Sequence, residues 1–362
     1  TGNFLVAVPK EPIDVFFDPS GVIGQTLAPK RVALNLTANH NMGTVPLAQG
    51  FLVTAIVRRT NGSAVSGADI DVHDSATGDK QYTPGDNTDN NGFVDFVVRA
   101  GTFDIEFCAP TAFRLVTLVR ADEVVSAAKN LGVVTMQNGV QLSGHVQSAG
   151  GAAIANCDID VFVSSTGMEV PTCFDNTDAS GNYAVIVPTG TFNVVFTPDW
   201  LTPYSSDTAL NVVVNADKIL NRTLGACDGA VSTGSGTPGT GGRIPVITSS
   251  GGYLRIGNPH WTGNVTNARG GATAFLYVAA GSYCGSMGGN AWMPLRMLGS
   301  PRVFTLGGTV GAAGQGTGGA VFPLPAYAPL VGLELNGRII VVDPVGANGF
   351  ASTPVLCGTF CD

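Results

Sequence analysis

The segment GADIDVHDSATGDKQYTPGDNTDNNG (residues 67–92) occurs a second time, 89 residues further along the chain, as NCDIDVFVSSTGMEVPTCFDNTDASG (residues 156–181). The two copies align without a gap, and the letters D-I-D-V, T-G and D-N-T-D occupy equivalent positions in both. Ile70 and Val72 alternate with Asp69 and Asp71, which places the apolar side chains on one face of a β-strand. The segment therefore predicts a repeated β unit with one buried face.

The repeat extends beyond these segments. GTFDIEF (101–107) corresponds to GTFNVVF (190–196), and GNFLVAVPKEPIDVFFDP (2–19) aligns without a gap on GNYAVIVPTGTFNVVFTP (181–198). We therefore expect full β-sandwich repeats at 51–139 and 140–226, each built from short strands in two sheets. Residues 1–50 are then the carboxy-terminal half of a further repeat, and residues 2–19 within it are expected to form two strands joined by a turn.

The pattern of an apolar strand, T-D-x-x-G with an aromatic residue, and a P-x-G-T-[FY] turn resembles the carboxypeptidase regulatory-like domains of secreted bacterial surface proteins. Those domains have a transthyretin-like (collagen-adhesin B-type) β-sandwich fold. The resemblance covers about residues 1–226, and Arg99 departs from it where Pro188 keeps the family's turn. It implies tandem sandwiches that serve as spacers, adhesin stalks or sugar-binding accessories and are not themselves catalytic.

Half a sandwich exposes an open sheet edge and an apolar face, both of which promote association. Two explanations remain open: the other half belongs to polypeptide that the sequence does not include, or another chain supplies the strands. We expect assembly to depend on the apolar strand positions and on the edge from Arg31 to Thr37. The candidate assembly residues are Phe4, Val6, Val8, Ile13, Val15, Phe17, Arg31, Val32, Leu34 and Leu36.

Composition supports an all-β fold, because 49 glycines and 21 prolines separate short runs rich in Val, Ile, Phe and Thr. Residues 227–242, CDGAVSTGSGTPGTGG, are predicted to form a Gly/Ser/Thr/Pro linker, and residues 243–362 a distinct carboxy-terminal β-sandwich domain with strands that include GYLRIG (252–257) and GRIIVVDP (337–344). Residues 1–242 carry a net charge of −11 and residues 243–362 one of +3. Opposite charge at the two ends favours head-to-tail association.

Seven cysteines lack the paired spacing of a zinc site, so we expect disulfides and an oxidising, extracellular environment. The odd count leaves one thiol over. The candidate disulfide residues are Cys157, Cys173, Cys284 and Cys361, with Cys284 joined to Cys357 or Cys361 in the tail domain. Thr1 is not an initiator Met and no leader follows it, so we expect a mature or truncated product. No window is apolar enough to predict a membrane span.

No catalytic motif is present: the chain has no G-x-S-x-G, H-E-x-x-H or G-x-x-x-x-G-K, and its four histidines are scattered. We predict no enzyme activity, no cofactor and no metal site. The D-N-T-D loops offer several oxygen ligands but lack the spacing of a Ca²⁺ loop, and we expect them to cap turns. The candidate carbohydrate-stacking residues are Trp200, Tyr204 and Trp261. The net charge of −8 argues against nucleic acid as a partner.

Together these observations predict an extracellular or cell-surface structural protein: a subunit of a self-assembling filament or surface appendage, joined by inter-subunit β-strand complementation. The expected partners are further copies of the chain, in a head-to-tail homopolymer. The alternative is a carbohydrate-binding or spacer region of a larger secreted adhesin or enzyme, with a glycan as partner.

Overall fold

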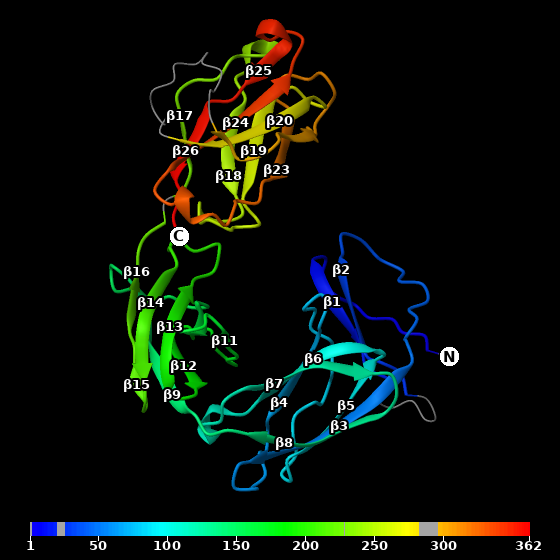
Figure 1. Ribbon diagram of the computed structural model, residues 1–362. Coiled ribbons are helices and arrows are strands. Elements are labelled where there is room, and N and C mark those ends of the chain that lie inside the picture. The colour runs from blue at the N-terminus through cyan, green and yellow to red at the C-terminus, as the bar shows by residue number, and fades with distance from the viewer. Residues whose placement is uncertain (1, 20–25, 228, 282–295) are drawn as a thin grey trace.

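The computed structural model describes residues 2–19, 26–227, 229–281 and 296–362. These residues form an all-β protein, as the sequence predicts, in which 3-10 turns are the only helices described. Figure 1 shows four successive parts along the chain: an amino-terminal half-unit (2–49), a first repeat (50–139), a second repeat (140–226) and a carboxy-terminal unit (227–362). In the described part of the chain, no helix is long and apolar enough to cross a membrane.

The first repeat is a sandwich of two three-stranded sheets, ordered β5-β3-β8 and β4-β6-β7. The central strand β3 runs antiparallel to β5 and parallel to β8. Alternate residues of all six strands meet in one core, and Ile70 and Phe103 are fully buried there. The elements are β3 (Gly50–Arg59), β4 (Asp69–Asp74), β5 (Phe93–Arg99), β6 (Gly101–Cys108), η1 (Thr111–Phe113), β7 (Leu118–Val125) and β8 (Lys129–Met136).

The second repeat has the same plan, with sheets ordered β11-β10-β13-β14 and β12-β9-β15, and with β16 also paired to β9. Its central strand β9 again runs antiparallel to one neighbour, β12, and parallel to the others, β15 and β16. The strands are β9 (Val140–Ser148), β10 (Asp158–Val163), β11 (Glu169–Val170), β12 (Asn182–Val187), β13 (Gly190–Thr197), β14 (Asp207–Val214), β15 (Lys218–Ile219) and β16 (Arg222–Leu224).

A disulfide and an ion pair are among the contacts that hold the described parts of the two repeats together. A disulfide joins Cys108, at the end of β6, to Cys173 in the loop after β11. Arg114 in the first repeat forms an ion pair with Asp217 in the second, with 2.5 Å between Nη1 and Oδ1. The covalent bond is the stronger of the two restraints, because both ion-pair side chains are largely exposed.

The amino-terminal half-unit contains one antiparallel pair, β1 (Pro12–Phe17) with β2 (Lys30–Asn35). The prediction of a second strand within residues 2–8 is wrong: residues 2–9 are assigned to no strand. The repeats supply the reason. The equivalent strands β5 and β12 are held in place by the central strands β3 and β9, and the described half-unit contains no such strand.

The carboxy-terminal unit packs two sheets, ordered β17-β26-β24-β20-β21 and β18-β19-β23; β22 also pairs with β20, and β25 with β24. Trp261 lies at the centre of its core. The elements are β17 (Val231–Thr233), η2 (Thr240–Gly242), β18 (Val246–Ser250), β19 (Thr262–Ala268), β20 (Thr273–Ala280), β21 (Arg296–Met297), β22 (Arg302–Thr305), β23 (Gly316–Val321), η3 (Ala328–Leu330), β24 (Glu334–Val342), η4 (Ala347–Gly349), β25 (Phe350–Ser352) and β26 (Val355–Thr359).

Two predictions about this part of the chain are wrong. Residues 227–242 are not a free linker, because β17 pairs with β26 and Thr240 donates two hydrogen bonds of 2.7 Å to the Asp343 carboxylate. Residues 252–257 form turns rather than a strand, apart from a single bridge between Arg255 and Cys361. In both places backbone groups pair with residues about 100 positions away, which local composition cannot reveal.

Candidate strand-binding groove

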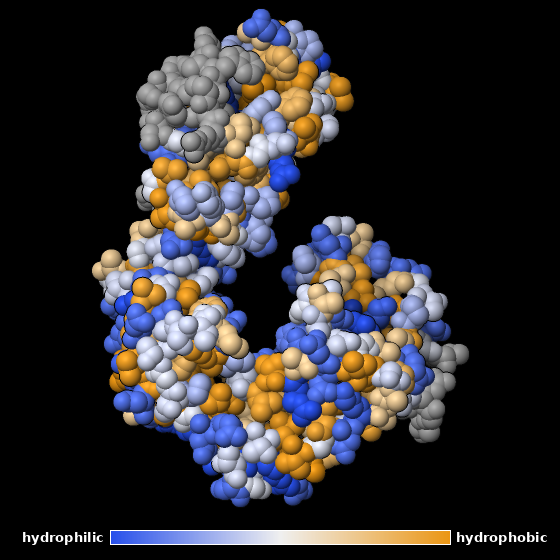
Figure 2. Space-filling model, in the orientation of Figure 1, coloured by the Kyte–Doolittle hydropathy of each residue, from blue (hydrophilic) through white to orange (hydrophobic). Residues whose placement is uncertain are grey.

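The amino-terminal half-unit is hollowed by a groove of about 750 Å³. One wall is the extended segment Gly2–Lys10, and the other is residues 38–43. The floor is apolar. It is formed by Ile13 and Val15 of β1, Leu34 of β2 and Leu36 just beyond it. Figure 2 shows apolar residues at the molecular surface around β1 and β2.

The apolar side chains of the first wall are exposed where their equivalents in the repeats are buried. Phe4, Val6 and Val8 expose 55%, 60% and 41% of their surface. The aligned residues Tyr183, Val185 and Val187 of β12 expose 4% or less, as do the aligned residues of β5. The same sequence pattern therefore lies on the inner face of a sandwich in two units and lines an open groove in the third.

The second wall is the counterpart of β8. Residues 40–47, HNMGTVPL, align with residues 129–136, KNLGVVTM, at the repeat offset. The local turn is the same: Gly43 and Gly132 both have positive φ, and each donates its N–H to the side chain of the Asn two residues earlier, at 2.9 and 2.8 Å. Sequence reasoning did not name residues 38–43 as site residues, although the equivalence of Gly43 and Gly132 was a usable signal.

These equivalences define what the groove lacks. In the first repeat, β3 lies between β5 and β8 and hydrogen-bonds to both. The two walls of the groove correspond to β5 and β8, so the groove is the space that a central strand fills in a complete unit. Its walls offer backbone N–H and C=O groups to a β-strand.

The floor has a second open edge. The strand β1 is the counterpart of β6, which pairs with β4 on one side and β7 on the other. Among the described residues, β1 pairs with β2 alone. The free edge of β1, on the side away from β2, is therefore the edge that β4 covers in the complete first repeat. The role of the Arg31–Thr37 edge stays a prediction; its counterpart β7 is itself an edge strand in the complete first repeat.

The structure brings most of the candidate assembly residues together. Seven of them line the groove: Phe4, Val6, Val8, Ile13, Val15, Leu34 and Leu36. The Phe17 ring packs edge-on against that of Phe4, with 5.6 Å between ring centroids, and Val32 pairs with Val15 across the two strands. Arg31 is different, because its exposed guanidinium pairs with Asp14 at 2.7 Å on the other face of the β1–β2 ribbon.

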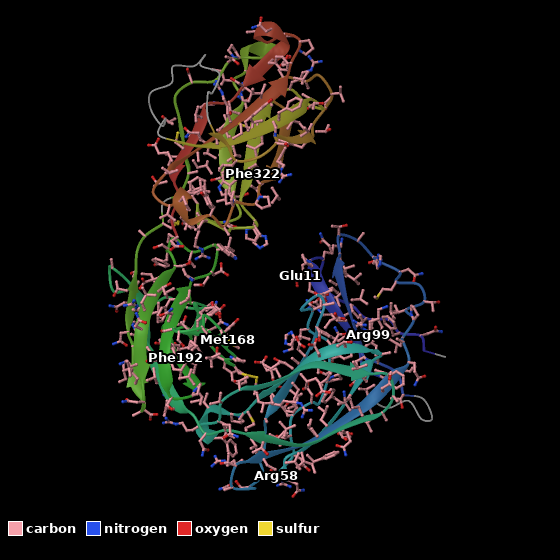
Figure 3. The ribbon with its side chains drawn as sticks, in the orientation of Figure 1. Glu11, Arg58, Arg99, Met168, Phe192 and Phe322 are labelled. Atoms are coloured by element: carbon pink, nitrogen blue, oxygen red, sulfur yellow. A yellow bond between two sulfur atoms is a disulfide. The ribbon has the colours of Figure 1, made fainter. Side chains whose placement is uncertain are left out.

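The half-unit contacts the first repeat through backbone hydrogen bonds and an aromatic pair. Ala28 and Gly50 donate backbone hydrogen bonds of 2.9 Å to Ala48 and Thr26, which holds the base of the half-unit to the start of β3. The Phe16 ring contacts the Tyr82 ring at 4.6 Å between centroids. Figure 3 shows Glu11 immediately before β1, and the Glu11 carbonyl accepts a hydrogen bond of 3.2 Å from the Leu36 N–H. The floor and its support are thus formed without a central strand.

The three candidate carbohydrate-stacking residues do not form a platform. Trp261 is fully buried in the core of the carboxy-terminal unit, so its proposed stacking role is wrong. The Trp200 ring is covered by the Arg255 guanidinium, with 4.0 Å from Cζ to the ring centroid. Tyr204 is half-buried and forms a backbone bridge with Ala226. Large aromatic residues are more often packing than binding surfaces, and these follow that tendency.

The D-N-T-D loops act as turn caps. Asp89 accepts backbone hydrogen bonds from Asn91 and Phe93, and Asp178 accepts them from Ser180 and Asn182, all at 2.8 Å. These bonds close each tight turn before β5 and β12.

The acidic strands β4 and β10 differ in how their charge is balanced. In the first repeat the Lys80 ammonium pairs with Asp71. The equivalent position in the second repeat is Glu169, so a like charge faces Asp160. Burial, and then repulsion from Asp160 and Asp175, raises the pKa of Asp158 to about 6. Burial, with repulsion from Glu169 second, also raises the pKa of Asp160.

The structure places three of the four candidate disulfide residues. Cys173 pairs with Cys108, and Cys361 pairs with Cys227, so of the two alternatives expected for Cys284 the pairing with Cys361 is wrong and the pairing with Cys357 stays a prediction. Cys157 is not in a disulfide; its thiol is free and buried, and burial raises its pKa to about 12. The side chain packs in the core of the second repeat. Cys284 lies outside the described residues.

The sequence matches no protein-family model and no curated protein. Among solved structures, the chain is similar to a type II cohesin–X-dockerin complex from Acetivibrio cellulolyticus (20% identity, 25% of this chain and 58% of that chain, TM-score 0.20). It is also similar to a streptococcal ancillary pilin, with 9% identity over 81% of this chain and 89% of that chain and a TM-score of 0.25. A third similar structure is the shaft pilin SpaA of Lactobacillus rhamnosus GG, with 9% identity over 50% of this chain and 99% of that chain and a TM-score of 0.23. The chain thus spans 58% of the first of these. Such values carry no inference about ligand, partner or assembly.

Proposed function

We propose that this chain is an extracellular structural protein whose amino-terminal half-unit is completed by a β-strand from another polypeptide, joining subunits of a filament or surface appendage. The observation that carries the proposal is the groove between residues 2–10 and 38–43, which occupies the place of a central strand. Two disulfides in the described chain support an oxidising, extracellular setting.

The energetics favour an occupied groove. Fully burying a Val or Phe side chain stabilises by roughly 1.5–3 kcal/mol, so covering the exposed parts of Phe4, Val6 and Val8 contributes about 3 kcal/mol. Apolar side chains on the incoming strand contribute a similar amount, and backbone hydrogen bonds to both walls add to it. Association costs at least about 4 kcal/mol in lost freedom of motion. A single strand therefore binds weakly, and a second strand on the open edge of β1 strengthens the contact.

The proposal is tested by placing a charge inside the groove. Val6→Asp puts a carboxylate on the inner face, where burial without a partner costs several kcal/mol. Leu5→Asp is the matched control: Leu5 lies in the same wall, but its side chain is fully exposed, and its counterpart in the first repeat is already an aspartate, Asp95, on the exposed face of β5. We expect electron microscopy and sedimentation to find polymers for the native chain and for Leu5→Asp, and dispersed subunits for Val6→Asp.

Two controls keep the result interpretable. Circular dichroism and thermal unfolding of both repeats should be unchanged in either variant, because residues 5 and 6 lie outside their cores. Polymers of Val6→Asp equal in length and number to those of the native chain would overturn the proposal.

A further inference from the structure

We infer that the groove selects its partner strand by side-chain size, and that the partner is an extended segment of another polypeptide with the pattern apolar-x-aliphatic-x-(Gly or Ala)-x-Val. The inference rests on the proposed function and specifies the strand that the groove accepts. It is drawn from the two complete repeats, in which equivalent walls already hold a strand.

The register of the repeats gives the middle of the pattern. Val53 and Leu142 lie opposite Phe96 and Val185, the counterparts of Val6. Two residues further along, Ala55 and Gly144 lie opposite Val94 and Tyr183, the counterparts of Phe4. The aliphatic position and the small position are therefore set by which wall residue each one faces.

The small position is set by a backbone carbonyl and an aromatic wall residue together. Gly144 faces Tyr183, and a Cβ at Gly144 would collide with the Leu220 carbonyl and lie 2.9 Å from the Tyr183 ring. In the first repeat the wall residue is the smaller Val94, and the strand carries Ala55. Phe4 is aromatic like Tyr183, and Met42 stands at the position of Leu220, so the half-unit resembles the second repeat and excludes large side chains here.

The ends of the pattern follow from the same register. Opposite the counterparts of Val8 stand Phe51 and Val140, which makes the first position apolar. At the other end, the N–H groups of Val57 and Val146 donate to the carbonyls of Gly92 and Gly181 at 2.7 and 2.8 Å, and both valines are fully buried.

Gly2 is the counterpart of these two glycines, so its carbonyl accepts from a valine of the partner. The walls thus specify four alternating inward positions, none of them charged.

The two complete repeats of a folded second copy do not provide this strand. Its β3 is hydrogen-bonded to β5 and β8, and its β9 to β12, β15 and β16, so neither has a free edge to offer. The donor is therefore a segment that is extended before it binds. The D-I-D-V strands β4 and β10, which follow β3 and β9, pair with the counterparts of β1 and mark where the donor continues.

The test uses a peptide with the sequence of β9, VQLSGHVQS, labelled with fluorescein and titrated against the full chain by fluorescence anisotropy. A peptide with Gly144→Phe should bind at least tenfold more weakly, because the aromatic ring meets Phe4. A peptide with Ser143→Phe, altered on the outward face, should bind as the parent does. The chain variant Phe4→Ala should recover part of the binding of the Gly144→Phe peptide, because it removes the aromatic neighbour and leaves the backbone one; a nonspecific contact would not respond in this way.

The outcomes separate the two proposals. Loss of parent-peptide binding in Val6→Asp, with discrimination between the two altered peptides, supports both. Saturable binding of all three peptides with equal affinity, abolished by Val6→Asp, overturns size selection and leaves strand complementation standing. Absence of binding by every peptide, with the chain in dispersed form, overturns both. A dimer whose interface is the groove, and which the parent peptide does not dissociate, overturns the assignment of the occupant.

Discussion

The acidic strand β10 makes the stability of the second repeat depend on pH. Asp158 and Asp160 lie on the same face of β10, and burial raises the pKa of Asp158 from 3.8 to about 6. In the unfolded chain the Asp158 carboxyl returns to its ordinary pKa. The perturbation we consider is Asp158→Asn, which keeps the shape of the side chain and removes its titration.

The sign of the effect follows from proton binding. Between about pH 4 and pH 6 the folded state holds the Asp158 proton and the unfolded state does not, so the free energy of unfolding falls as pH rises through this window. A shift of about two pKa units corresponds to roughly 3 kcal/mol. Asp158 is only half-buried, so solvent screening reduces the expected change to about 1–2 kcal/mol.

Urea unfolding at pH 4, 5, 6 and 7, followed by far-ultraviolet circular dichroism, measures this slope. Between pH 4 and pH 7 the native chain should lose about 1–2 kcal/mol more than Asp158→Asn loses. The control is Asp69→Asn at the equivalent position of the first repeat, where Lys80 supplies a positive charge nearby. A slope that is the same in the native chain and in Asp158→Asn would refute the reasoning.

Two further changes exploit differences between the repeats. Glu169→Lys should raise the free energy of unfolding by up to about 1 kcal/mol and lower the Asp160 pKa, because it replaces a repulsion with an exposed ion pair. Urea unfolding measures the first effect and carboxyl NMR titration the second. An unchanged Asp160 pKa would count against this prediction. Gly144→Ala should destabilise by about 1–3 kcal/mol, because its Cβ meets the Leu220 carbonyl. At Gly150 a Cβ would make only an ordinary contact of 3.8 Å with the Ser148 hydroxyl, so Gly150→Ala should change little in thermal unfolding. Equal melting temperatures for the two alanine variants would contradict this account.

The sequence revealed the repeats because Ile70 and Val72 alternate with acids in the same register as Ile159 and Val161, and this periodicity survives in every complete unit. The strand expected in residues 2–8 did not form, because a ladder needs a partner that local pattern does not contain. Trp261 and Cys157 were misjudged for a related reason: burial is set by which segments pack together, and neither residue carries a local sign of it.

Part of the groove could be predicted from the sequence alone. Its first wall and floor follow from the alignment of residues 2–19 with residues 181–198. Its second wall follows from the shared Asn-x-Gly turn at Gly43 and Gly132, but only once the parallel pairing of β8 with β3 is known. Parallel pairing between distant segments is a property of topology, and a single sequence carries no direct record of it.

Two disulfides between described residues set how far the chain stretches under tension. A pull between the termini passes from Cys108 directly to Cys173, and from Cys227 directly to Cys361. The intervening segments, with sequence separations of 65 and 134 residues, carry no load. At about 3.4 Å per extended residue, the first bond prevents roughly 220 Å of chain extension and the second roughly 450 Å. The second repeat's strands β9 and β10 and nearly all of the carboxy-terminal unit are thereby shielded from mechanical unravelling while the bonds stay oxidised.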